Sequence, residues 1–163
     1  MITKEQYLTS FNKELDIIKH LAEKITPAML EYRPTAGQRS TMELLQYLGH
    51  ISATATRAFI DPVKNNYMEL AKAKDLVTFE NFMATMDEQK KIVTAEVNAL
   101  TEDDMVRVTE LFGMKDQLSF HLLSVLKWIT AYKMQLFLYI KANGVDNIST
   151  SNVWGGFDMP PKA

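Results

Sequence analysis

Residues 39–48 read RSTMELLQYL, a stretch that carries both a helix start and the first turns of an apolar helix face. A serine followed three residues later by a glutamate is a capping box, in which each side chain satisfies a backbone N–H of the other residue. Ser40 and Glu43 therefore predict a helix that continues to about Phe59 and ends before Asp61 and Pro62. Its inward face is expected to carry Leu44, Leu48, Ile51 and Ala55.

Helical periodicity also marks the chain before and after this segment. Thr3 and Gln6 form a second capping box, and an apolar stripe with spacings of three and four follows as far as Ile25. Thr78 is a candidate N-cap for a third helix, whose apolar face extends to Leu100. The longest helix is expected from about residue 116 to residue 142, and four helices that each bury one face predict an all-α bundle.

The connections between these helices differ in character. A polar crossover, with one turn of helix between Pro62 and Lys74, leads to the third helix, and residues 101–115 are expected to be a loop with local β character. Residues 146–163 are rich in glycine and proline and predict an irregular tail. We expect Trp154 and Phe157 to pack this tail on the bundle.

Length and composition suit one cytoplasmic domain spanning residues 1–163. The chain has no cysteine, so it has neither disulfides nor thiolate metal sites and is compatible with a reducing compartment. A net charge of −2, without a concentrated basic patch, argues against a nucleic-acid partner. No secretion signal is evident, and no segment approaches the roughly 20 apolar residues of a membrane span.

Two segments together resemble the DinB-like family, the DinB/YfiT superfamily of helical bundles. The first is residues 39–48, similar to the family pattern W-S-x-x-E-[IL]-L-x-H-L, and the second is residues 128–140, similar to H-x-x-x-H-R-x-Q-L-x-x-Y-L. The resemblance implies a four-helix bundle with a long crossover between the second and third helices. It also implies a metal site with three histidine ligands, whose positions are occupied here by Tyr47, Trp128 and Tyr132.

Phenol and indole groups are poor ligands for the zinc or nickel ion that the resemblance implies. We therefore expect no metal cofactor and interpret the three rings either as core aromatics, with Trp128 substantially buried, or as the lining of a remodelled pocket for a small apolar or aromatic ligand. His50 leaves an alternative open, because a one-turn shift of the alignment would place it in the ligand position. His121 lies about 10 Å along the helix from Trp128 and cannot replace a ligand there.

Other candidate residues have both a functional and a structural reading. Gln135 matches the family pattern and could hydrogen-bond Tyr132, a ligand, the backbone or solvent. Arg33, in the sequence YRP before the second helix, could bind an anion or tie its loop to a helix C-terminus, and we favour the tie. His20 is expected to face solvent. No Ser/His/Asp pattern or phosphate-binding glycine motif is present.

The resemblance implies two kinds of activity, a metal-dependent hydrolase and a thiol-dependent transferase, and both depend on the metal to lower the pKa of a nucleophile. Because the ligand positions are altered, we expect a non-catalytic domain that binds a small molecule or associates with protein. The alternative is an enzyme of the family type that uses His50 with non-standard ligands. A homodimer is expected as well, because the last helix is apolar around much of its circumference.

Overall fold

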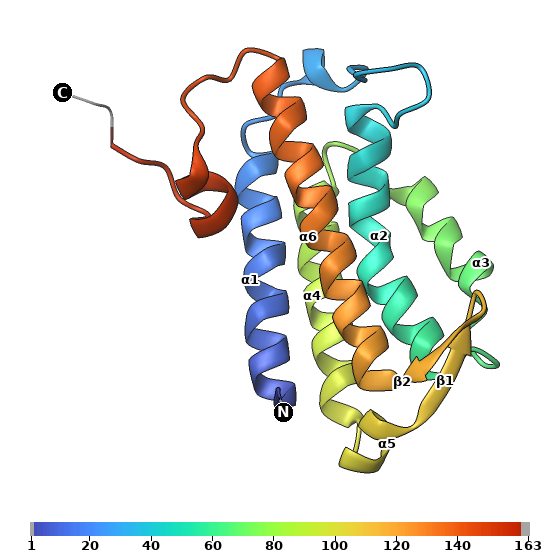
Figure 1. The fold of residues 1–163 in the computed structure, drawn as a ribbon. Coiled ribbons are helices and arrows are strands. Elements are labelled where there is room, and N and C mark those ends of the chain that lie inside the picture. The colour runs from blue at the N-terminus through green and yellow to red at the C-terminus, as the bar shows by residue number, and fades with distance from the viewer. Residues whose placement is uncertain (1, 161–163) are drawn as a thin grey trace.

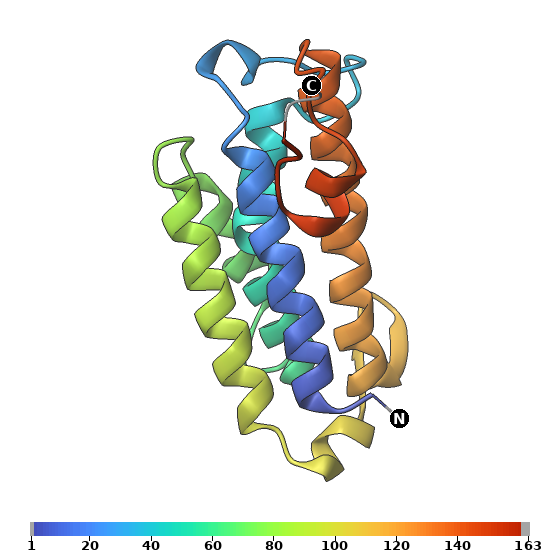
Figure 2. The same cartoon turned by 90° about the vertical axis from the view of Figure 1, so that its left-hand side faces the viewer.

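Four long helices stand side by side in the computed structural model of the protein, which describes residues 2–160 (Figure 1). They are α1 (Lys4–Ala22), α2 (Thr41–Ile60), α4 (Phe82–Ala99) and α6 (Leu118–Ala142). The view turned by 90° shows the same four helices, with the C-terminal segment against α1 and α6 (Figure 2). The all-α fold class predicted from periodicity and capping is confirmed.

The expected helix starts agree with the structure at two of three places. Thr3 with Gln6, and Ser40 with Glu43, form complete capping boxes at the starts of α1 and α2. The prediction for Thr78 is wrong, because the N-cap of α4 is Asn81. Thr78 and Asn81 bond to each other's backbone N–H at 2.8 and 3.2 Å, and this reciprocal pair makes a turn just ahead of the helix.

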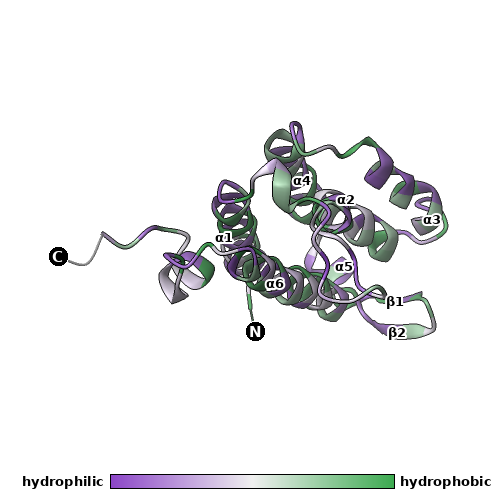
Figure 3. Ribbon diagram, turned by 90° about the horizontal axis from the view of Figure 1, so that it is seen from above, coloured by the Kyte–Doolittle hydropathy of each residue, from purple (hydrophilic) through white to green (hydrophobic). Residues whose placement is uncertain are grey.

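The core lies between the four helices, as the view down the bundle shows (Figure 3). Each helix contributes large side chains with almost no exposed surface, including Phe11, Leu15 and Ile18 from α1, Leu44, Leu48 and Phe59 from α2, Phe82 and Val93 from α4, and Val125, Ile129 and Leu136 from α6. Their spacing of three and four residues is the periodicity that marks the helices in the sequence. Among the described residues, no helix is long and apolar enough to cross a membrane.

The connections contain more regular structure than expected. The crossover holds a one-turn helix, α3 (Tyr67–Leu70), and a 3-10 segment, η2 (Ala71–Leu76), which lies against α2. The stretch predicted as a loop contains α5 (Glu102–Val106) and a hairpin of β1 (Val108–Leu111) with β2 (Met114–Gln117). Phe112 and Gly113, with φ of 55° and 72°, form the two-residue turn that suits a twisted hairpin.

The C-terminal segment packs on the bundle mainly through side chains other than those expected, although the half-exposed Trp154 ring lies over Lys133 Nζ of α6. Ile148, Asn152 and Val153 are buried, whereas Trp154 and Phe157 remain 55% and 54% exposed. The segment includes one short helical turn, η3 (Ser151–Gly155). The turn lies close to α1, and aliphatic and amide side chains fill this contact. The larger Trp154 and Phe157 rings remain about half exposed.

The expectation that His20 faces solvent is also wrong, because the C-terminal segment covers it. The His20 side chain is 13% exposed, and its Nε2 accepts a hydrogen bond of 3.0 Å from the Asn152 amide. Asp158 extends this contact by accepting from the same amide and by pairing with Lys24 at 2.6 Å. These polar contacts join the segment to the end of α1.

Candidate functional site

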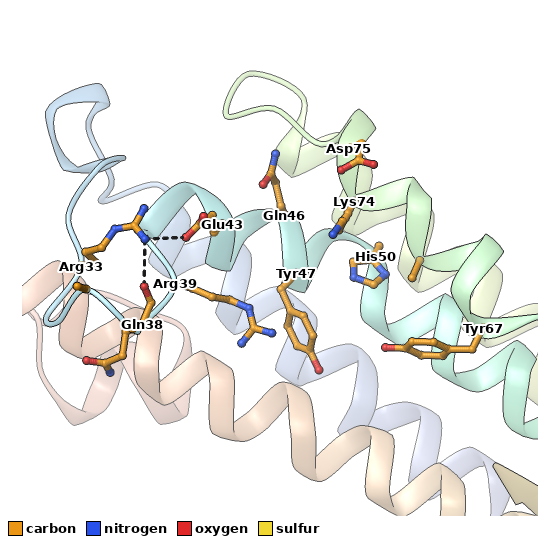
Figure 4. Close-up of a pocket in the computed structure, with 13 residues that line it drawn as sticks. Arg33, Gln38, Arg39, Glu43, Gln46, Tyr47, His50, Tyr67, Lys74 and Asp75 are labelled. Carbon is orange, nitrogen blue, oxygen red and sulfur yellow. Dashed lines mark hydrogen bonds and ion pairs between the residues drawn. The ribbon is translucent and has the colours of Figure 1, made fainter. Parts of the chain in front are cut away.

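A pocket opens beside α2, between the loop that precedes this helix and the α3–η2 crossover. Its volume is about 540 Å³. Arg39, Tyr47, His50, Tyr67, Lys74 and Asp75 are among the residues that line it (Figure 4). The lining therefore combines aromatic rings with charged groups, a combination that binding sites for small molecules commonly use.

Arg39 and two tyrosines form a compact cluster beside the pocket; Arg39 and Tyr47 line the pocket, whereas Tyr132 is not among its lining residues. The rings of Tyr47 and Tyr132 lie 4.5 Å apart between centroids, so residues from α2 and α6 meet here as the sequence predicts. The guanidinium carbon of Arg39 lies 4.4 Å from the Tyr47 ring centroid and 5.4 Å from that of Tyr132. Arg39 Nη1 also donates to the Tyr132 hydroxyl at 3.4 Å. A fixed positive charge is therefore in contact with both rings.

The Tyr47 hydroxyl is held in its neutral form. Burial is the main cause that raises its pKa, and the neighbouring phenols of Tyr132 and Tyr67 add to this effect, whereas Arg39 opposes it. A phenolate at this position is disfavoured because a charged group loses its hydration on burial. At neutral pH Tyr47 consequently has a hydroxyl proton that it can donate.

His50 lies one turn beyond Tyr47 on α2 and is 3% exposed. Its Nδ1 lies 3.2 Å from Thr54 Oγ1, and the Thr54 hydroxyl donates to the Leu70 carbonyl at 3.5 Å. Since that hydroxyl proton is used, the arrangement favours an imidazole with its proton on Nδ1 and a free lone pair on Nε2. Burial, followed by the charges of Lys74 and Arg39, lowers the pKa of His50 to about 4.

Trp128 and Gln135 lie outside the pocket. Trp128 packs against the core on Phe59, with 5.9 Å between ring centroids, and is half-buried, where substantial burial was expected. The Gln135 amide donates to the Tyr139 hydroxyl at 2.6 Å, and that hydroxyl donates to the Arg39 carbonyl at 2.9 Å. Gln135 therefore supports the backbone of Arg39 through Tyr139, a role that differs from the bonds to Tyr132 or a ligand that the sequence left open.

Arg33 ties its own loop, but to the N-terminal turn of α2 and not to a helix C-terminus as expected. Its Nη1 lies 3.4 Å from Glu43 Oε2 and donates to the Gln38 carbonyl at 3.3 Å (Figure 4). Glu43 is thus shared between the capping box of α2 and the loop that approaches the helix. Although Arg33 lines the pocket, its charge already has a carboxylate partner.

His121 is a structural residue of the lower bundle. It is buried, stacks on Phe59 at 4.3 Å between ring centroids, and its Nε2 donates to the Thr109 carbonyl at 3.1 Å. This bond joins α6 to the hairpin. His121 is therefore committed to packing and is separate from the pocket that His50 lines.

The residues at the implied metal position do not fit a divalent ion. Trp128 offers no lone pair, the Tyr47 hydroxyl is held neutral, and the Arg39 cation lies against the Tyr47 and Tyr132 rings. His50 supplies a single imidazole. In the part of the chain that the structure describes, no three His, Cys, Asp or Glu side chains are grouped closely enough to hold a metal.

Three residues of the pocket were missed by the sequence reasoning. Tyr67 and Lys74 belong to the crossover, which is polar and irregular in sequence, and only the folded crossover brings them over α2. Arg39 had a signal, since the family pattern has tryptophan at that position. A charged residue where the resembled pattern has an aromatic one predicts a positive charge next to Tyr47.

No protein-family model matches the chain, and no curated protein matches it. Among solved structures, a DinB-like protein from Bacillus subtilis is similar over 88% of this chain and 95% of its own length, with 19% identity and a TM-score of 0.70. Another DinB-like protein, from Bacillus cereus, is similar over 86% of this chain and 92% of its own, with 11% identity and a TM-score of 0.65. The chain therefore has the DinB-like fold.

Proposed function

We propose that the protein binds a small molecule in the pocket beside α2 and does so without a metal ion. The observation that carries this proposal is the position of Arg39, whose guanidinium lies against both Tyr47 and Tyr132. A divalent cation placed between the same side chains would face a fixed positive charge and neutral phenols. The cluster instead suits an acceptor group supplied by a ligand.

The pocket has the size of a small-molecule site, and its lining, which is mostly polar and charged, suits a polar ligand. Its volume of about 540 Å³ lies within the roughly 300–1,000 Å³ typical of small-molecule sites. The Tyr47 and Tyr67 rings provide apolar surface, and His50 provides a lone pair on Nε2. Gln135, acting through Tyr139, fixes the backbone of Arg39 and so preorganises the cationic group before a ligand arrives.

The metal content of the purified protein distinguishes this proposal from the alternative, a metal-dependent enzyme with His50 as a ligand. Native protein should contain no stoichiometric zinc, nickel or manganese by elemental analysis, and His50→Ala should not change that result. About one tightly held ion per chain, lost on His50→Ala, would overturn the proposal in favour of the enzyme.

A designed metal site supplies a positive control. Tyr47→His, Trp128→His and Tyr132→His together restore the implied ligands, and adding Arg39→Ala removes the positive charge next to them. We expect zinc binding to be weaker with Arg39 present, because two like charges a few Å apart repel. Equal zinc affinity with and without Arg39 would show that the guanidinium does not control the site.

We further propose that the protein acts in the cytoplasm, with which its cysteine-free sequence is compatible. We also propose that it associates as a homodimer through one face of α6. Phe120 and Leu138 are 49% and 56% exposed, and their separation of five helical turns places them on the same face. Light scattering over a concentration series tests the dimer. A mass near 18.6 kDa throughout would rule it out.

A further inference from the structure

Two cationic side chains of the pocket form no ion pair with a carboxylate of the described residues. Of the three basic residues that line it, Arg33 pairs with Glu43, whereas no ion pair within 4 Å joins Arg39 or Lys74 to an acidic group of residues 2–160. Asp75 also lines the pocket, but in Figure 4 its carboxylate lies on the far side of Lys74 from Tyr47. The inner part of the pocket consequently holds more positive charge than its own side chains neutralise.

The effect of this excess charge is visible at His50. After burial, the charges of Lys74 and Arg39 are the next causes that lower its pKa, and Asp75 opposes them more weakly. The positive potential at the imidazole therefore comes from two separate elements, the loop before α2 and the η2 segment. An anion placed between them would face both cations, which favours its binding over that of a neutral or cationic molecule.

The aromatic residues complete a set of donors. The pKa of Tyr67 is raised, chiefly by burial, so its hydroxyl, like that of Tyr47, keeps its proton at neutral pH. Figure 4 shows the Tyr67 hydroxyl directed toward Tyr47. Arg39 contributes only one N–H to Tyr132, and a guanidinium carries five donors, so several remain for a ligand.

We propose that the ligand is a small organic anion, whose carboxylate or phosphate group is bound by Arg39 and Lys74 and whose apolar body packs on Tyr47 and Tyr67. The inference rests on the proposed function, because it names the chemical class that the same pocket binds. Charged donors meeting an anionic acceptor form the stronger class of hydrogen bonds. Arg39 and Lys74 are exposed, so salt screens this attraction, and the probes are compared at low ionic strength.

Four probes separate charge from shape: benzoate, phenyl phosphate and neutral benzamide, which are of similar size, and the smaller inorganic phosphate ion. Each is titrated into the full-length protein, and binding is followed by shifts of backbone amide NMR signals. We expect benzoate and phenyl phosphate to bind at least about tenfold more tightly than benzamide, the ratio that one charge-assisted hydrogen bond provides. Inorganic phosphate should bind more weakly than phenyl phosphate because it lacks the ring.

Variants identify the groups that are responsible. Lys74→Met should weaken phenyl phosphate binding about tenfold, and Arg39→Gln should weaken it by at least as much. Lys72→Met is the matched control, because Lys72 belongs to the same η2 segment, is exposed and pairs with Glu69. It should leave the affinity for phenyl phosphate unchanged while altering net charge as Lys74→Met does.

The outcomes separate this inference from the proposed function. If benzamide binds as tightly as benzoate, or if Lys74→Met and Lys72→Met have equal effects, the pocket binds small molecules but does not select anions. If none of the four probes shifts the signals of Tyr47, His50 or Tyr67, the proposed function fails and the inference fails with it. Binding of inorganic phosphate as tight as that of phenyl phosphate would overturn the role given to the two rings.

Discussion

Tyr132 and Lys133 are neighbours in α6, yet they belong to two opposite kinds of cationic cluster. On one face of the helix, Lys133 Nζ lies 2.7 Å from Glu14 Oε2 and 4.8 Å from the Trp154 ring centroid. On the other, the Arg39 guanidinium lies against Tyr132 and Tyr47. Both clusters place a cation on an aromatic ring, but only the first includes a carboxylate.

The difference in charge balance accompanies a difference in burial. The Lys133 side chain is 0% exposed and the Glu14 side chain is 18% exposed, so this ion pair is sealed between α1, α6 and the C-terminal segment. Arg39 is exposed and borders a pocket. A buried cation requires a partner within the fold, whereas a cation at a pocket can obtain its partner from a ligand. The first cluster is structural, and the second has the form of a binding site.

Removing the carboxylate from the sealed cluster should have the largest effect. Glu14→Gln leaves the Lys133 charge buried without its partner, and we expect the free energy of unfolding to fall by about 3 kcal/mol in urea titrations. The contact has the distance of an ion pair without the direction of a hydrogen bond, so its loss is mainly a loss of charge compensation.

Two matched variants test whether the cluster of the exposed Arg39 with Tyr47 and Tyr132 contributes less to stability than the buried Lys133–Glu14 pair. Arg39→Gln should cost less than about 1 kcal/mol, since an exposed cation on a ring contributes little. Lys133→Met combined with Glu14→Gln should recover most of the loss, because no charge is then left buried. Equal costs for Glu14→Gln and Arg39→Gln would remove the distinction between the two clusters.

Acid should lower the stability of the protein through His50, which lines the pocket. Its pKa is about 4 in the folded protein against 6.5 for the free side chain, so between these values the unfolded chain binds more protons and the folded state loses stability as pH falls. We expect a loss of about 2 kcal/mol between pH 7 and pH 4, reduced from the full shift by solvent in the pocket. Unfolding measured over this range should show a flatter profile for His50→Gln; identical profiles would contradict the assignment.

The sequence was sufficient for most of the bundle because its signals are local. The capping boxes at Thr3 and Ser40 and the apolar spacing of three and four depend only on residues within a few turns. The hairpin was seen only as local β character, since short strands outside the core carry little periodicity. Trp154 and Phe157 were expected to pack the tail on the bundle because they are large and apolar, whereas the residues buried there are Ile148, Asn152 and Val153.

The candidate site was less predictable because tertiary contacts assemble it. Spacing along α6 brought Tyr132 to Tyr47 as expected, whereas Trp128, one turn away, packs on Phe59 outside the pocket. The contribution of Lys74 depends on how the crossover folds over α2, which no local pattern encodes. Spacing predicts which residues share a helix face, but it does not predict which loop cation meets them.

Trp128→Ala tests whether the Trp128 side chain of α6 belongs to the core. Because the ring is half-buried, we expect a cost of about 1.5 kcal/mol, below the roughly 3–5 kcal/mol of removing a fully covered aromatic. Phe59→Ala, which removes the completely buried ring beneath it, supplies the larger value for comparison. Unfolding by urea measures both, and equal losses would show that Trp128 is part of the core.

The smallest expected effect concerns the ring that covers the sealed cluster. Trp154→Ala should lower the free energy of unfolding by about 1 kcal/mol, because it removes a cation–π contact with Lys133 and exposes the ion pair to water. Phe157→Ala is the control, since that ring is equally exposed, at 54% against 55%, and lies three residues further along the same segment. It should cost less than about 0.5 kcal/mol, as expected for a surface substitution. Equal losses for the two variants in urea titrations would mean that Trp154 contributes only apolar surface, and that Glu14 alone stabilises the buried lysine.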